Sequence, residues 1–195
     1  FDVIPKAVDE YLTFLEKYPE EEPARQLENP VWHIHSGNPP AETTPVSFAL
    51  LLNLVAVANP EDKSQLWGFI SQYAPDASPE KNLLLDELAG YAMSYYQDFV
   101  LPQKTYRAPT DKERAAMEDL SARLKAFDGE PTSENLQTLT FSVGKEHEFE
   151  NLREWFQALY EVLLGQSQGP RFGSFAALYG VANTARLMDE ALARD

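Results

Sequence analysis

The stretch that decides the fold is TPVSFALLLNLVAVANP, residues 44–60. Its apolar run from Phe48 to Ala58 is interrupted only by Asn53, and it falls short of the roughly 20 apolar residues that cross a bilayer. A run of this kind predicts a helix buried inside the protein. Thr44 is expected to cap that helix, with Pro45 at its first position, where the missing N–H is no loss.

Helical periodicity continues upstream of this stretch. Between residues 5 and 18, apolar side chains recur at helical spacing and form one stripe, made by Val8, Tyr11, Leu12 and Leu15. The charged residues 20–29 follow Pro19 and contain Pro23, so we expect a linker there. Residues 31–41 hold Gly37 and two further prolines, which indicates an extended segment or a loop.

Downstream, cap residues and apolar stripes alternate. Asn59-Pro60 is expected to begin a helix that runs to Tyr73, and a longer helix is expected to end before Pro102. Thr110 and Glu113 have the spacing of a capping box. The remaining expected helices are Ser133–Val143 with Gly144 as its C-cap, Asn151–Gly165, Ser174–Tyr179 with Gly180 after it, and a last one capped by Asn183.

Together these elements predict an all-α fold, a bundle or cage of about eight or nine helices with short loops and no sheet. Residues 1–28 are expected to form an N-terminal helix and acidic linker, and residues 29–195 a helical domain, which divides on one interpretation into two packed subdomains, 29–130 and 131–195. In the helix after Asn151, Phe156 continues the apolar stripe and is expected in the core. Its neighbour Trp155 is expected to differ from it in role.

The amino-acid composition limits the range of possible functions. The formal net charge of -15 argues against nonspecific binding to nucleic acid, DNA included, because phosphate contacts need clustered Lys and Arg. The absence of Cys excludes disulfides and thiolate zinc sites and fits a reducing compartment, so a cytoplasmic location is expected, with no membrane contact. The chain has no secretory signal and opens at Phe1 without a methionine, as expected of a fragment of a longer protein.

The signatures of catalysis are missing from the sequence. It contains no Gly-rich phosphate loop, no dinucleotide fingerprint and no Gly-x-Ser-x-Gly elbow. His33 and His35 form a His-x-His pair, but a metal site needs three or four ligands and His147 is the only other histidine. We therefore expect no metal site, no cofactor and no catalysis by this chain.

Three segments stand out as candidates for binding RNA, because aromatic rings stack on splayed bases and guanidinium groups pair with phosphates or base edges. They are residues 29–40, 95–107 and 163–175, and their candidate contact residues are Trp32, His33 and His35, then Lys104, Tyr106 and Arg107, then Gln168, Arg171 and Phe172. A basic patch of Lys104, Arg107, Lys112 and Arg114 is expected to attract phosphate. The alternative for residues 163–175 is a helix–loop–helix corner, in which glycines cap helices and aromatics fill the core.

The same segments carry a family resemblance. The strings VWHIHSGNPP (31–40), VSFALLLNL (46–54), DFVLP (98–102) and GPRFGSF (169–175) resemble the C-terminal half of class I lysyl-tRNA synthetases, from about Asn29 onward. Residues 163–180 also resemble the final helices of glutamyl-tRNA synthetases. The string His33 to Gly37 is superficially similar in sequence to the HIGH signature of the class I catalytic site. It is not that motif, because His35 occupies the position where the ATP site needs glycine.

The resemblance implies a cage of helices that approaches the anticodon arm of lysine tRNA. The parent enzyme would activate lysine with ATP and Mg²⁺ on an N-terminal Rossmann-type domain bearing HIGH and KMSKS signatures, both absent from this sequence. Lysine tRNA and that catalytic domain would be the partners of this chain. The alternative is a helical protein-interaction module with no RNA role, which the acidic charge favours slightly.

Overall fold

A computed structural model describes residues 3–194 as helices joined by short connections, with no strand in that range. The eleven α-helices are α1 Ile4–Lys17, α2 Pro23–Gln26, α3 Pro30–Ile34, α4 Phe48–Ala58, α5 Lys63–Tyr73, α6 Leu83–Tyr95, α7 Asp111–Lys125, α8 Ser133–Glu146, α9 Leu152–Leu164, α10 Phe172–Tyr179 and α11 Val181–Leu192. Nine of them have seven or more residues. The all-α prediction and its helix count are confirmed. The division at residues 28/29 and 130/131 stays a prediction.

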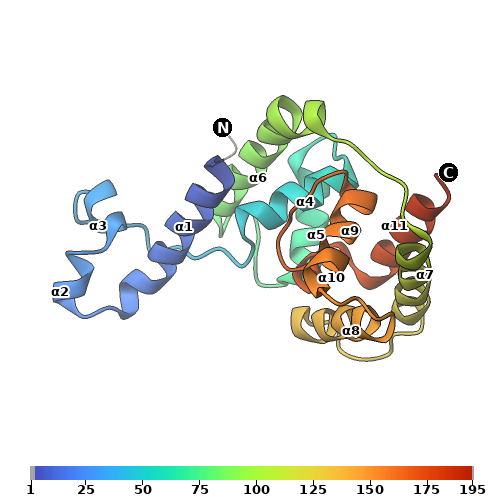
Figure 1. Cartoon of the computed structure of the whole chain (residues 1–195). Coiled ribbons are helices and arrows are strands. Elements are labelled where there is room, and N and C mark those ends of the chain that lie inside the picture. The colour runs from blue at the N-terminus through green and yellow to red at the C-terminus, as the bar shows by residue number, and fades with distance from the viewer. Residues whose placement is uncertain (1–2, 195) are drawn as a thin grey trace.

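Helices α1 to α3 form a lobe that projects from the main body, which contains α4 to α11 (Figure 1). A short 3₁₀ helix, η1 Tyr18–Glu20, follows α1 and turns the chain toward α2. The residues expected to be a linker and a loop therefore contain two short helices. Asn29 explains the second, because its side chain accepts a hydrogen bond from the Val31 N–H at 3.0 Å and so caps α3.

Helix α4 lies at the centre of the body and is buried along almost its whole length. Its N-cap is Ser47, whose hydroxyl accepts from the Leu50 N–H at 3.2 Å, so the expected cap at Thr44 is wrong. Asp9 of α1 accepts from the next two orphan donors, Phe48 N–H at 2.6 Å and Ala49 N–H at 3.2 Å. The start of α4 is thus fixed by a carboxylate that is 39 positions away in the sequence.

Other expected helix ends also differ from the structure. Asn59 ends α4 in the left-handed region at φ 42°, and Asp62, not Asn59, caps α5. The helix expected to stop before Pro102 becomes a π-helix, η2 Tyr96–Val100, and then a 3₁₀ turn, η3 Leu101–Gln103. Asn183 lies inside α11, which begins directly after Gly180. By contrast, the capping box at Thr110, the cap at Asn151 and the left-handed Gly165 at the end of α9 are confirmed.

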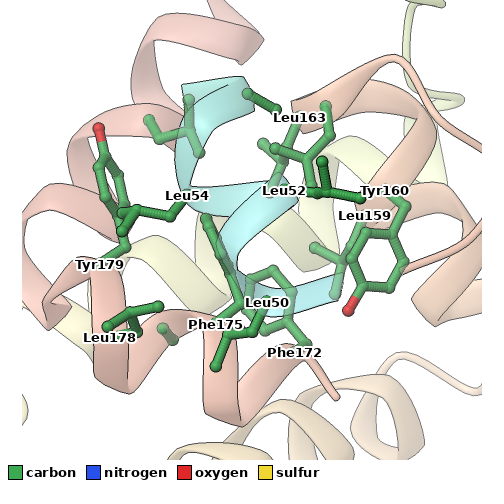
Figure 2. Packing of buried hydrophobic residues seen from close by; sticks show 14 of the residues in the cluster. Leu50, Leu52, Leu54, Leu159, Tyr160, Leu163, Phe172, Phe175, Leu178 and Tyr179 are labelled. Carbon is green, nitrogen blue, oxygen red and sulfur yellow. The ribbon is translucent and has the colours of Figure 1, made fainter. Parts of the chain in front are cut away.

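One hydrophobic core joins α4 to the C-terminal helices. Figure 2 shows α4 between Leu159 and Leu163 of α9 on one side and Phe175 and Tyr179 of α10 on the other. The Phe175 and Tyr179 rings stack at 5.6 Å. Because α9 is enclosed by α4, α8 and α11, it buries more than the single stripe visible in its sequence.

The expected roles of Trp155 and Phe156 are reversed in the structure. Trp155 is fully buried, and its indole N–H donates to the Thr140 carbonyl of α8 at 3.0 Å. Phe156 is only partly buried and packs against Phe141. Gly144 lies within α8 rather than at its end, and a Cβ there would lie 2.6 Å from Trp155. The missing side chain of Gly144 is what lets α8 approach the indole closely.

Candidate functional site

The first candidate segment, residues 29–40, lies in the projecting lobe. Its rings pack on one another, because Trp32 meets His33 edge-on at 5.0 Å and lies against Gly37. His35 is bound to α1 through a hydrogen bond of 2.9 Å between its Nε2 and the Tyr11 hydroxyl. His33 is exposed, Trp32 and His35 half-buried. The rings of this segment are therefore largely engaged within the lobe.

The second segment holds cations that bind other parts of the same chain. Lys104 donates to the Ala56 carbonyl at 3.1 Å, in the last turn of α4, and to the Tyr96 hydroxyl at 3.2 Å. Its ammonium group also lies 5.0 Å from the centre of the exposed Tyr106 ring. A cation at this place stabilises the C-terminal end of a helix, where unpaired carbonyls gather. Lys104 thus has a structural role.

Arg107 is held by two carboxylates. It forms a two-pronged pair with Glu113 at 2.7 and 2.9 Å and a further bond to Glu161 at 2.5 Å. Burial acts to raise the pKa of Glu113, but the hydrogen bonds from Arg107 and Thr110 outweigh it and hold that pKa below its usual value. The guanidinium of Arg107 therefore already has the anionic partners that an RNA phosphate would replace.

The rest of the expected basic patch is also engaged internally. Lys112 donates to the Glu148 carbonyl at 2.7 Å and lies over the Phe149 ring. Arg114 donates to the Leu192 carbonyl at 2.9 Å, at the end of α11. These cations tie α7 to its neighbours and do not form an open phosphate-binding surface.

In the third segment, the glycines serve packing within the chain. A Cβ on Gly169 would lie 2.2 Å from the Tyr160 ring, and one on Gly173 would lie 2.2 Å from the Ser133 carbonyl. The Tyr160 hydroxyl donates to the Pro170 carbonyl and fixes the loop, and burial raises the pKa of Tyr160. These contacts support the corner interpretation for the glycines.

Of the three candidate side chains in this segment, one is buried and two are exposed. Phe172 is 2% exposed and meets Tyr160 and Phe175 in the core, so its ring is not offered at the surface. Gln168 and Arg171 are exposed. Within residues 3–194, the Arg171 side chain forms no hydrogen bond and no ion pair. No polar contact of the Arg171 side chain within those residues therefore pins one helix to another.

The second and third segments meet at an open cleft of about 1460 Å³. Its walls are α1, the π-helix with the turn after it, and the loop Gly165–Pro170, while α4 forms its floor. The Thr105 N–H donates to the Gly165 carbonyl at 3.1 Å and joins the last two of these walls. Of the candidate residues, Lys104 and Gln168 line the cleft. Arg171 directly follows the lining residue Pro170.

The cleft also contains residues that the sequence did not single out. Lys6, Lys17 and Asp9 come from α1, and Asn53 comes from α4. Asn53 is 2% exposed, and its side-chain nitrogen has no hydrogen-bond partner among residues 3–194. The available signal was this one amide inside the apolar run 48–58. Burial raises the pKa of Asp9, opposed by the two N–H groups of α4 that it accepts from.

Two further features of the structure bear on the class of site. Across residues 3–194, no group of three or more His, Cys, Asp or Glu side chains is arranged to hold a metal ion. No helix in the described part of the chain is both long and apolar enough to cross a membrane. Residues 3–194 thus form an all-α structure that contains a large open cleft.

Comparison with known proteins finds aminoacyl-tRNA ligases among the relatives of this chain. No family model matches the chain. The chain is 56% identical over 193 residues to the lysine–tRNA ligase of Roseobacter denitrificans, and this match covers 99% of this chain and 36% of that protein. It is 48% identical over 194 residues to the lysine–tRNA ligase of Rickettsia bellii, covering 98% and 37%, and 48% identical over 191 residues to that of Rickettsia felis, covering 97% and 36%.

The chain is therefore homologous to a segment of the lysine–tRNA ligases, and the resemblance found in the sequence is confirmed. It spans somewhat more than a third of the length of the curated relatives it matches.

Proposed function

We propose that this chain is the C-terminal, anticodon-arm-binding part of a class I lysine–tRNA ligase, and that it binds lysine tRNA along the cleft and the adjoining Arg171. The homology supports tRNA as the partner. Arg171 carries the proposal, because its guanidinium is exposed and has no partner in residues 3–194, and because it directly follows Pro170, which lines the cleft. Its planar fork of donors suits a phosphate or a base edge.

In this proposal, ATP, Mg²⁺ and lysine are bound by a catalytic domain that these 195 residues do not include. That domain is the second partner of the chain, and the whole enzyme acts in the cytoplasm. The chain itself binds RNA and performs no aminoacylation. The catalytic domain supplies much of the affinity for tRNA, which explains how a chain with a net charge of -15 can take part.

The test is a fluorescence-anisotropy titration of the chain with lysine tRNA, at low and at moderate salt. Arg171→Ala is compared with Arg153→Ala, which removes another exposed arginine in the first turn of α9. Arg153 is a matched control because it lies at the opposite end of α9 from Gly165, roughly 18 Å away at 1.5 Å per residue. Both variants should melt at the temperature of the parent chain.

Loss of Arg171 should weaken binding by about 1–3 kcal/mol, or roughly 5- to 150-fold in Kd, if it makes a directional contact. A phosphate contact would also lower the slope of log Kd against log salt by about 1. Equal binding by the Arg171 and Arg153 variants would refute the role of Arg171. Failure of the unmodified chain to bind tRNA at low salt would refute the proposed function.

A further inference from the structure

We infer that the lobe made by α1, α2 and α3 turns on the body as one unit, about a hinge at residues 39–41, and that the Asp9 carboxylate is the latch that holds it in place. This movement is built into the fold and does not depend on which ligand the chain binds. Because α1 forms one wall of the cleft, a turn of the lobe changes the width of the cleft. Asp9 is thus a positioning residue for that wall.

The lobe has internal contacts of its own. Leu15 and Val31 are 3% and 0% exposed, yet neither belongs to the main hydrophobic core, which begins at Val46. The buried side chain of Asn29 adds a polar brace, because its amide donates to the Phe14 carbonyl of α1 at 3.1 Å. Buried apolar side chains and a buried hydrogen bond both resist deformation, so the three helices of the lobe can move together.

The connection from the lobe to α4 is fixed at both ends and free in the middle. The Asn38 N–H donates to the His35 carbonyl at 3.1 Å, which ties the chain as far as residue 38 to the lobe. Glu42 accepts from the Leu84 N–H at 2.9 Å, which ties residue 42 to the start of α6. Between them, residues 39–41 (Pro-Pro-Ala) form no hydrogen bond with any part of residues 3–194. A few connecting residues of this kind are where hinges absorb a change in backbone angles.

Asp9 supplies the polar part of the joint between α1 and the body. Within residues 3–194, the hydrogen bonds that join α1 to the body are the two that Asp9 accepts, from the Phe48 N–H at 2.6 Å and the Ala49 N–H at 3.2 Å. Both donors lie in the first turn of α4 and have no acceptor inside that helix. The positive end of the α4 dipole adds to the attraction for a carboxylate. Loss of Asp9 therefore removes every hydrogen bond of this joint.

The rest of the joint is weak enough to open while the main core stays folded. Val8 and Leu12 are the side chains of α1 that pack against the main core, and both are only half-buried. Asp9 is half-buried too, and burial raises the pKa of its carboxyl while the N–H groups of Phe48 and Ala49 lower it. Water therefore competes with α4 for the Asp9 carboxylate, which is what a reversible latch requires.

The test measures the distance between the lobe and the body with two nitroxide labels and pulsed electron double resonance. The labels are attached at Ala24→Cys in α2 and Thr138→Cys in α8, two exposed positions on opposite sides of the molecule (Figure 1). The sequence has no cysteine, so no other position is labelled. Asp9→Ala leaves two N–H groups without an acceptor while the lobe is closed, and opening lets water reach them. The ratio of open to closed lobes should rise at least about tenfold, the usual effect of one hydrogen bond to a charged group.

The matched control is Asp62→Ala, which also removes a carboxylate that caps a helix. Asp62 accepts from the Ser64 N–H at 2.9 Å and the Gln65 N–H at 3.3 Å, so it caps α5 from within the body and does not contact the lobe. The Asp62 variant should keep the distance distribution of the parent chain. Asp9→Asn retains one acceptor oxygen and should lie between the parent chain and Asp9→Ala. It also provides the comparison should Asp9→Ala fail to fold.

A second pair of labels, at Ala7→Cys in α1 and Ala24→Cys in α2, tests whether the lobe moves as a unit. Both positions are exposed and both lie in the lobe, so their distance should be the same in the parent chain and in Asp9→Ala. A broader distribution within the lobe would mean that the lobe unfolds instead of turning, and would overturn the inference. Unchanged lobe-to-body distances in both folded Asp9 variants, or an equal shift in Asp62→Ala, would overturn the role of Asp9. Neither result bears on tRNA binding, so the proposed function is tested separately.

Discussion

Replacing Trp155 with alanine should be among the most destabilising single changes in this chain. Trp155 is 0% exposed, lies 5.2 Å from the Phe149 ring and donates to the Thr140 carbonyl at 3.0 Å. A buried aromatic side chain removes about 150–250 Å² from water, which is worth about 4–6 kcal/mol at roughly 25 cal/mol per Å². Measured tryptophan and phenylalanine truncations in protein cores cost about 3–5 kcal/mol, and we expect that range.

Phe156→Ala is the matched comparison, because it changes the adjacent residue of the same helix. Phe156 is only partly buried and packs edge-on against Phe141 at 5.0 Å, so its loss should cost less than about 2 kcal/mol. Urea unfolding followed by far-UV circular dichroism gives both free energies, and equal slopes would show that the unfolded states are comparable. A smaller loss for Trp155→Ala than for Phe156→Ala would refute the assignment of faces on α9.

Three further outcomes are expected. Gly173→Ala should lower the free energy of unfolding by about 1–3 kcal/mol, since its Cβ would lie 2.2 Å from the Ser133 carbonyl; an unchanged urea midpoint would contradict this close packing. Because the folded state lowers the pKa of Glu113, ionised Glu113 stabilises the fold fully at pH values above its ordinary pKa of about 4.5, and this stabilisation is lost as the pH falls through the lowered pKa. In that pH range the melting temperature should therefore decline more steeply in the parent chain than in Arg107→Met. The chain should show no lysine-dependent exchange of pyrophosphate with ATP, and exchange above background in a preparation free of host enzyme would reveal a site that the sequence does not display.

Local signals in the sequence predicted local structure well. The capping box at Thr110 and the caps at Asn151 and Gly165 depend on residues within a few positions of each other, and all three are confirmed. The predicted start of α4 is wrong because two residues that can cap a helix, Thr44 and Ser47, lie close together in the sequence. The choice between them depends on Asp9, whose contact with Phe48 joins α1 to α4.

Contacts between residues far apart in the sequence also limited the prediction of the candidate site. The cations Lys104 and Arg107 fit an RNA-binding patch in sequence, but their partners Ala56 and Glu161 lie 48 and 54 positions away. No local pattern reveals such pairing. Arg171 and Gln168 are both exposed, and Gln168 lines the cleft, but their contact with RNA stays a prediction. Asn53 is visible in the sequence as the one polar residue of its run, but only three-dimensional packing shows that its side-chain nitrogen has no partner among residues 3–194.

The cleft joins segments that are far apart in the sequence, and this affects when it can exist during synthesis. Its first wall, α1, ends at Lys17, and its opposite wall begins at Gly165, about 150 residues later. At about 5–20 residues per second, a ribosome needs roughly 7–30 s to make the second wall after the first. That wall is then positioned by α10, which packs on α4 and α8, so it forms only after these helices dock. A ligand that needs both walls of the cleft therefore binds only after synthesis has passed α10.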